Sequence, residues 1–233
     1  MNRAILSVDW DYFVKIIPQW CGSYIENQRG LLSAWYRRYI EEGIKGINLE
    51  EEIKVSKDAL SFWNKIRSKF KLSEDVKVFV SDSHKYSYDI SKYYDCDEVF
   101  LFDAHSDLGY GGLASLHFEL NCANWLGKLF KDNIVKRANI FYSPYTLEKP
   151  EDFKELNYNY DVNYLDFDKF NEKNHIDVIH ICRSGGWTPP WLDKDFYKFI
   201  KALNLPYKEL EDLKRIWRPK ELTFSEEINY LIS

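Results

Sequence analysis

Three short, mainly apolar runs in this chain are each followed by a cluster of polar side chains. All three clusters contain aspartate, and two of them also contain histidine. Val-Phe-Leu-Phe at 99–102 precedes Asp-Ala-His-Ser-Asp, the run 76–80 precedes Ser-Asp-Ser-His, and the run 4–8 precedes Asp-Trp-Asp. Runs of this length and composition are typical of buried strands. Because open α/β sheets bind ligands beyond the carboxyl ends of their strands, the three clusters predict one polar site at that edge of a sheet.

Helical patterns separate the apolar runs. The expected helices lie at 30–42, 57–70, 120–130 and 191–203, with one more near the C-terminus. Further strands are expected at 139–142 and 178–182. Ser56 is a candidate helix cap and Gly43 a candidate helix stop. Alternating strands and helices predict an α/β fold with a mostly parallel sheet covered on both faces. No repeat or Gly/Ser/Pro-rich linker interrupts the sequence, so we expect a single domain over 1–233.

The composition is that of a globular chain. Its 233 residues are 45% hydrophobic and 30% charged, which argues against disorder and collagen-like structure. The net charge of −5 disfavours nucleic acid as a partner. No apolar run approaches the roughly 18 residues of a membrane helix, and the start of the chain lacks a signal-peptide pattern. We therefore expect no membrane partner and a cytoplasmic location.

The cysteines give no sign of a disulfide framework or of a zinc site. Four are present, and no two of them form a Cys-x-x-Cys pair. They stand far apart at Cys21, Cys96, Cys122 and Cys182. We expect buried free thiols, as in a reducing compartment.

The cluster after 99–102 has the spacing of a metal site. Alternate residues of an extended segment point to one side, so Asp103, His105 and Asp107 would project into one pocket. Two carboxylates side by side repel each other unless a cation lies between them. A mixed Asp/His donor set suits Mn, Fe, Co or Zn, whereas Ca prefers oxygen alone. Asp9 and Asp11 repeat the same spacing at another expected strand end.

His84 follows a third strand and completes a set of six candidate ligands. The set is Asp9, Asp11, His84, Asp103, His105 and Asp107. Six ligands are enough for two ions when carboxylates bridge, and two ions roughly 3.5–4 Å apart can share a water and lower its pKa. The predicted reaction class is metal-assisted hydrolysis at carbon or phosphorus. A second acid–aromatic–acid pattern, Asp-Phe-Asp at 166–168, competes for the role of Asp9 and Asp11. It lies in a more polar stretch, and we rank it lower.

These motifs resemble those of the ureohydrolases, the arginase and agmatinase superfamily. The segment 103–107 matches that family's DAHxD motif, 7–11 is similar to its SxDxD motif, and 81–84 resembles the segment that supplies an early histidine ligand. The resemblance implies a three-layer α/β/α sandwich, arginase-like, that holds two Mn²⁺ ions. Asp103 and Asp9 would then bridge the ions. The remaining ligands would complete one shell each, His84 with Asp107 and His105 with Asp11.

More narrowly, the chain resembles the peptide arginases of ribosomal-peptide natural-product biosynthesis. These enzymes convert arginine residues of a precursor peptide into ornithine and release urea. The similarity lies in the stretches 7–13, 81–86, 102–110, 121–127 and 183–191. The resemblance implies a precursor peptide as the partner and leaves the oligomeric state open. The glycine-rich segment 108–113 also favours a peptide over free arginine, because it offers close backbone approach and little charge.

Further residues of the sequence are candidates for roles around the substrate. Asp107, through the bridging water, or His117 would protonate the leaving amine. Arginases place a late glutamate against the guanidinium, and Glu119 is the candidate for that role here. Ser184 and Trp187, in the stretch 183–191, are the other expected substrate contacts.

Three other functions fit part of the pattern. A haloacid-dehalogenase-type phosphatase would use Asp9 as its nucleophile, but Phe13 stands where that family has Thr or Val, and the 103–107 motif stays unexplained. A deacetylase of the arginase-like fold would use one zinc ion and fewer ligands. A non-catalytic peptide-binding module that keeps a metal for structure is also compatible with the sequence.

Overall fold

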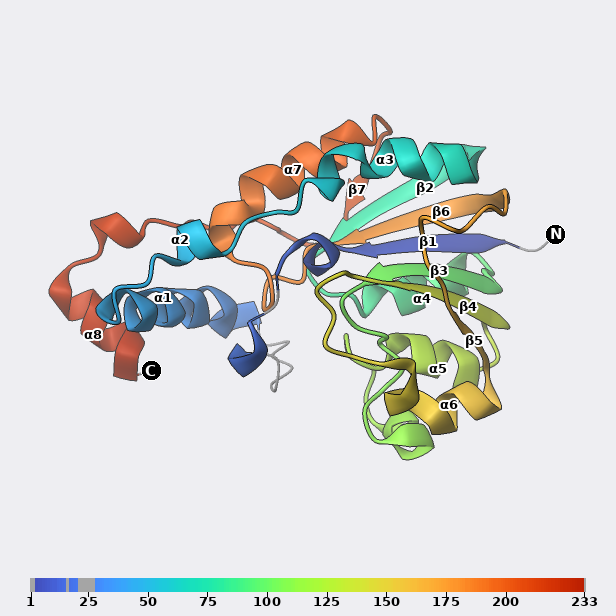
Figure 1. The fold of residues 1–233 in the computed structure, drawn as a ribbon, viewed down its shortest axis with the longest axis horizontal. Helices are drawn as coiled ribbons and strands as arrows, with labels where there is room; N and C mark the ends of the chain where they lie inside the picture. Colours follow the sequence, from blue (N-terminus) through green and yellow to red (C-terminus); the bar gives the residue numbers. More distant parts are fainter. Residues whose placement is uncertain (1–2, 16, 21–27, 233) are drawn as a thin grey trace.

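The computed structural model describes residues 3–15, 17–20 and 28–232. Its centre is a seven-stranded sheet in which all neighbouring strands run parallel, in the order β5-β4-β3-β1-β6-β2-β7. The strands are β1 (Ala4–Asp9), β2 (Phe70–Ser81), β3 (Glu98–Asp103), β4 (Arg137–Tyr142), β5 (Asp161–Tyr164), β6 (Asn174–Cys182) and β7 (Lys208–Glu209). Helices cover both faces, so the fold is the expected three-layer α/β/α sandwich (Figure 1).

Different helices pack on the two faces of the sheet (Figure 1). One face is covered by α3 (Asp58–Lys69) and α7 (Asp193–Ala202), and the other by α4 (Tyr86–Tyr93), α5 (Trp125–Lys131) and α6 (Lys154–Asn159). The first core is rich in aromatic rings, among them Trp10, Phe62, Trp63, Phe196 and Phe199. The second core is mainly aliphatic. Every residue of β1 is buried, as expected of a central parallel strand with helices on both sides.

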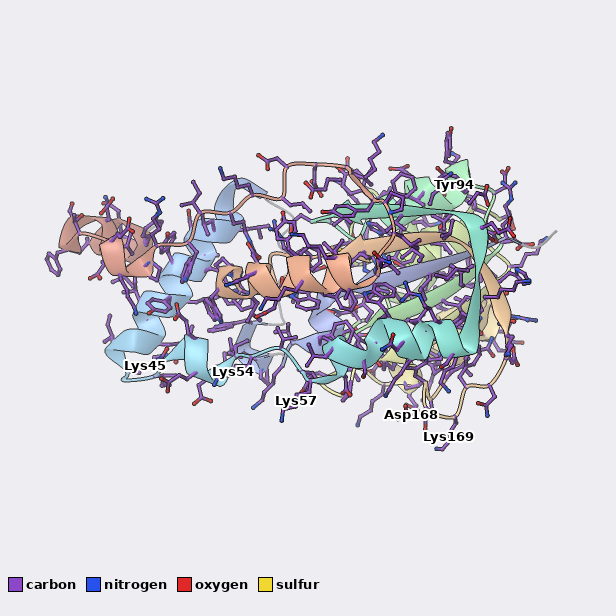
Figure 2. The ribbon with its side chains drawn as sticks, turned by 90° about the horizontal axis from the view of Figure 1, so that it is seen from above. Lys45, Lys54, Lys57, Tyr94, Asp168 and Lys169 are labelled. Carbon is purple, nitrogen blue, oxygen red and sulfur yellow. The ribbon has the colours of Figure 1, made fainter. Side chains whose placement is uncertain are left out.

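A group of helices lies beyond the carboxyl ends of the strands (Figure 1). It comprises α1 (Gln28–Ile44), α2 (Leu49–Glu52) and α8 (Phe224–Ile232). Tyr36 of α1 stacks between Trp217 and Tyr230, with ring centroids 4.4 Å and 4.6 Å away. Figure 2 shows from above how α1 and α8 extend the molecule away from the sheet. This places α1 on the same side as the strand ends that carry the acidic clusters.

Short 3-10 helices occupy several of the connections. They are η1 (Trp10–Phe13), η2 (Pro18–Trp20), η3 (Gly112–His117), η4 (Pro150–Phe153), η5 (Pro190–Leu192) and η6 (Pro219–Glu221). The described part of the chain contains no helix with both the length and the apolar character needed to cross a bilayer. Cys96, Cys122 and Cys182 are buried free thiols, as expected, whereas Cys21 lies outside the described residues.

Some differences from the sequence prediction are whole elements that it did not place, among them α4, α6 and β5, and others are at element ends. Helix α1 continues through Gly43, and the backbone turns instead at Gly46, whose φ is +79°. Helix α5 begins at Trp125 and not near 120, because the side chain of Asn124 accepts the backbone N–H of Asn121 and the two asparagines form a local turn. Strand β2 begins at Phe70, six residues earlier than expected.

Candidate metal centre

Four adjacent strands bring the acidic clusters together. Strand β1 lies between β3 and β6, and β2 pairs with the far side of β6. From β1 the chain passes to β2 on one side and then to β3 on the other, so the carboxyl end of β1 lies at a topological switch point, where ligands of such sheets bind. All six predicted ligands follow or end β1, β2 or β3 at this edge. The structure therefore brings all six into one cluster.

The first half of the cluster surrounds the imidazole of His84. Its Nδ1 lies 3.2 Å from Oδ2 of Asp9, 3.0 Å from Oδ2 of Asp103 and 2.9 Å from Oδ2 of Asp107. All four side chains are buried. His84 Nδ1 and Asp103 Oδ2 are both shielded from solvent without a hydrogen-bond partner. These two atoms face each other as acceptors unless a proton or a cation lies between them, and a divalent cation would satisfy both.

The second half of the cluster is centred on His105. Its Nδ1 lies 3.1 Å from Oδ2 of Asp11 and 3.5 Å from Oδ1 of Asp103. Asp103 thus gives one oxygen to each half, and both halves have the ligand spacing of a metal site. This is the shared position that the family resemblance implies for Asp103. Asp9 lies in the first half only, so a bridging role for Asp9 stays a prediction.

The electrostatics of the cluster also favour a cation. Burial, and then the charge of Asp11, raises the pKa of Asp9 to about 6. Burial and the three neighbouring carboxylates raise the pKa of Asp103 well above its ordinary value. For His84 and His105, burial alone would lower the pKa, but the carboxylates around them outweigh it and raise it. The cluster without metal therefore retains protons, which a divalent cation would replace.

Backbone and side-chain donors hold the carboxylates in place. Asp9 accepts the N–H of Asp11 at 3.1 Å, and Asp11 accepts the N–H of Ala104 at 3.2 Å. Asp107 accepts the indole N–H of Trp125 at 2.5 Å. Each aspartate still has an oxygen directed at a histidine. Such outer hydrogen bonds fix the orientation of metal ligands before the metal arrives.

Two residues of the centre have the left-handed backbone conformation that favours glycine. Asp107 has a φ of +52° and Ser184 a φ of +50°. The hydroxyl of Ser184 donates to Oδ2 of Asp9, so this conformation supports a contact within the centre. Left-handed non-glycine residues persist where the surroundings hold them, and they cluster at functional sites.

A cavity of about 360 Å³ opens over the cluster. It is near the small end of the range for ligand pockets, which suits a single side chain better than a large cofactor. Its walls are Asp9, Asp11, His84, His105, Asp107, Tyr110, Cys122, Ala123, Ser184 and Trp187. Two predicted substrate contacts, Ser184 and Trp187, are thus at the cavity. Trp187 lies edge-to-face with His105, at a centroid distance of 6.0 Å.

Two other predicted residues are not at the cavity. His117 ends η3 and is exposed, with its Nδ1 3.2 Å from Nζ of Lys131. Glu119 is exposed in the next turn, where its carbonyl accepts the side chains of Asn121 and Asn124. The turn that delays the start of α5 directs this segment outward. The structure does not support either residue as a contact of substrate in this cavity.

The loop that carries Ser184 and Trp187 is held in place by hydrogen bonds from residues that do not line the cavity. The indole N–H of Trp35 donates to the carbonyl of Gly185 at 2.7 Å, and Arg215 donates to the same carbonyl at 3.1 Å. Gly185 is required here, because a Cβ at this position would lie 2.8 Å from a carboxylate oxygen of Asp82. The helices beyond the strand ends therefore support one wall of the cavity.

Sequence reasoning missed one acidic residue beside the centre. Glu148 accepts the backbone N–H of Ser106 at 2.8 Å and the hydroxyl of Tyr142 at 3.2 Å, and it also accepts the hydroxyl of Tyr110. Burial raises the pKa of Glu148, an effect that the nearby His105 opposes. Glu148 thus holds the segment that contains the 103–107 motif. No local pattern marks it, since it lies 42 residues from Ser106 in the sequence.

The competing Asp-Phe-Asp pattern lies away from the centre. Asp166 pairs with Lys169 at 2.8 Å, and Asp168 pairs with Lys65 at 3.2 Å. Both carboxylates are exposed, and Figure 2 shows Asp168 and Lys169 at the rim of the molecule. This pattern therefore does not contribute to the cluster.

The comparisons with known proteins do not identify a family. Comparison with protein-family models, curated proteins and solved structures finds no match for this chain. What the fold and the cluster define is a class. The chain is an α/β protein with a parallel sheet and a buried Asp/His cluster that could bind metal.

Proposed function

We propose that this chain is a hydrolase with two divalent metal ions, manganese by preference, that converts arginine residues of a precursor peptide into ornithine and urea. The observation that carries the proposal is the pair of Asp/His groups that share Asp103 at the floor of a cavity. The mixed nitrogen and oxygen donors suit a borderline divalent ion. Such ions, when bound, would supply a water of lowered pKa and neutralise charge that develops on the substrate.

The walls of the cavity support a side chain of a peptide as the substrate. Apart from the predicted metal ligands, the described residues that line it are uncharged: Tyr110, Cys122, Ala123, Ser184 and Trp187. The α-ammonium and α-carboxylate of free arginine would find no charged partner among them. An arginine within a peptide has neither of these charged groups, so the uncharged walls cost it no binding energy. The indole of Trp187 offers a flat face to a planar guanidinium cation.

The chain's own residues can be given roles in this reaction. Ser184 and Trp187 would orient the guanidinium above the cluster. Asp107, which lines the cavity, would pass a proton to the leaving amine, since His117 lies outside the cavity. A cytoplasmic setting belongs to the same proposal, and the buried free thiols suit a reducing compartment.

The test combines metal analysis with a competition between substrates. Protein purified without chelator is assayed for bound metal. It is then supplied with Mn²⁺ and with equal concentrations of free arginine and of an arginine-containing peptide. We expect close to two ions per chain, urea release, and an arginine-to-ornithine mass change in the peptide. The matched inactive control is Asp103→Asn, which keeps the size of the side chain and removes the shared charge.

The other outcomes separate the alternatives. Turnover of free arginine and of none of several peptides would keep the reaction and refute the peptide substrate. Hydrolysis of a phosphate ester without urea from either substrate would favour a phosphatase. Metal binding without any turnover would favour a peptide-binding module with a structural metal.

A further inference from the structure

A continuous chain of polar side chains runs from the candidate metal centre into the core of the sheet. Nε2 of His84 lies 2.7 Å from the hydroxyl of Ser7, which lies 2.8 Å from the hydroxyl of Ser87. Ser87 lies 2.6 Å from Nδ1 of His180, and Nε2 of His180 lies 2.7 Å from the hydroxyl of Ser81. We call these residues the buried relay: Ser7, Ser81, Ser87 and His180. All four have no solvent-exposed surface.

The far end of the buried relay fixes the direction of every hydrogen bond in it. The Ser81 hydroxyl donates to the carbonyl of Ser83 at 2.8 Å, and a carbonyl can only accept. The Ser81 oxygen must then accept from Nε2–H of His180. A histidine that donates through Nε2 and is neutral accepts at Nδ1. His180 is fully buried and both of its ring nitrogens face serine hydroxyls, an environment that favours the neutral form.

Because each serine hydroxyl has one proton to donate, the directions of the remaining hydrogen bonds up to the metal centre follow. Ser87 donates to Nδ1 of His180, so its oxygen accepts from Ser7. Ser7 then donates to Ser87, and its oxygen accepts from Nε2–H of His84. With one proton at Nε2, a neutral His84 has its lone pair at Nδ1. That is the atom that faces three carboxylates and has no hydrogen-bond partner.

We infer that His180 is a positioning residue, which acts through Ser87 and Ser7 to hold His84 in the Nε2–H tautomer with its Nδ1 lone pair directed at the metal. This inference rests on the proposed metal site. The opposite tautomer would place a proton at Nδ1, where it would bond a carboxylate and compete with the ion. The buried relay therefore keeps the Nδ1 lone pair of a neutral His84 directed at the ion.

The structure provides a matched pair of substitutions in helix α4. Ser87 and Ser91 are one helical turn apart, and both are fully buried. The Ser87 hydroxyl belongs to the buried relay, whereas the Ser91 hydroxyl has no hydrogen-bond partner. Ser87→Ala and Ser91→Ala thus remove the same atom from two buried positions of the same helix. Only Ser87→Ala interrupts the relay.

The first readout is the binding of Mn²⁺ alone, measured by titration calorimetry. For Ser87→Ala we expect the dissociation constant to rise by about 10–100-fold, the range for loss of an outer-shell partner. Ser91→Ala should stay within about twofold of the wild type, as for an independent site. Equal affinities of the two variants would overturn the inference and leave the proposed function intact.

The second readout is the tautomer itself, measured by NMR of ¹⁵N-histidine-labelled protein without metal. We expect His180 to be neutral, with its proton on Nε2, and to keep that state in Ser91→Ala. A proton on Nδ1 of His180 would overturn the assigned direction. A wild-type protein that binds no Mn²⁺ at all would instead refute the proposed metal site, on which the inference rests.

Discussion

The two acid–aromatic–acid segments of this chain share a local hydrogen bond and differ in their surroundings. In 9–11 and in 166–168, the backbone N–H of the second aspartate donates to the carboxylate of the first, at 3.1 Å and 3.0 Å. In both, the central aromatic side chain is buried in the core beneath α3 and α7. This hydrogen bond and the buried aromatic residue are therefore common to the segment that enters the candidate centre and to the one that does not.

The difference lies in what surrounds the carboxylates. Asp9 and Asp11 are 2% and 1% exposed and face the histidines that follow β2 and β3. The side chains of Asp166 and Asp168 are 51% and 79% exposed and pair with lysines. The segment 9–11 leaves the central strand, where neighbouring strand ends converge. A short motif thus becomes a site only when the sheet brings other ligands to it.

The largest expected effect comes from replacing the first aspartate of each segment by asparagine. Asp9→Asn should weaken Mn²⁺ binding by more than about 100-fold and abolish turnover, because a metal ligand loses its charge while the size and the turn are kept. Asp166→Asn should leave both unchanged. Calorimetric Mn²⁺ titration and urea release measure the two effects. Equal losses in both variants would show that the segment 166–168 matters to the site.

Asp9→Asn, which weakens metal binding, should in contrast stabilise the metal-free protein. The pKa of Asp9 rises on folding from 3.8 to about 6, so the stability that its protonated form gives is complete below about pH 4 and lost as the pH rises through 6. Asp9→Asn avoids that loss. Above about pH 6 it should raise the free energy of unfolding by on the order of 1–3 kcal/mol.

Urea unfolding with chelator present measures this effect, and it should vanish toward pH 4. Asp166→Asn is the control and should follow the wild type at both pH values. A loss of stability in Asp9→Asn at pH 8 would mean that this carboxylate supports the fold and is not a group kept there for a cation.

The sequence predicts the layered fold and the converging ligands because both depend on local patterns. Strand ends at Asp9 and Asp103 are marked by apolar runs followed by acids, and the parallel sheet then brings them together. Glu148 and the buried relay carry no such mark, since their partners are tens of residues away. Glu119 was expected at the substrate for its charge, but the local turn at Asn121 directs it outward. Such contacts depend on tertiary packing, which periodicity does not encode.

An intermediate effect is expected from the acid that holds the 103–107 segment. Glu148 and Glu155 both accept a backbone N–H from the region between β3 and α5, from Ser106 at 2.8 Å and from Leu113 at 3.1 Å. Only Glu148 adjoins the centre, through its interaction with His105. Glu148→Gln should weaken Mn²⁺ binding about 10-fold, and Glu155→Gln should change it less than about twofold. Similar effects of both would mean that loop rigidity alone, and not the position of Glu148, supports the site.

The smallest expected effect concerns the ion pair of the exposed segment. Lys65 and Asp168 lie 3.2 Å apart, with 39% and 79% of their side chains exposed. Exposed pairs of this kind contribute about 0.2–1 kcal/mol, and salt screens them. A double-mutant cycle of Lys65→Met and Asp168→Asn should give a coupling energy in that range that falls toward zero in about 1 M salt, with Mn²⁺ binding unchanged. If the coupling energy did not fall with salt, the Lys65–Asp168 pair would be shielded from solvent, as Asp9 and Asp11 are. If Mn²⁺ affinity changed, the segment 166–168 would influence the metal site.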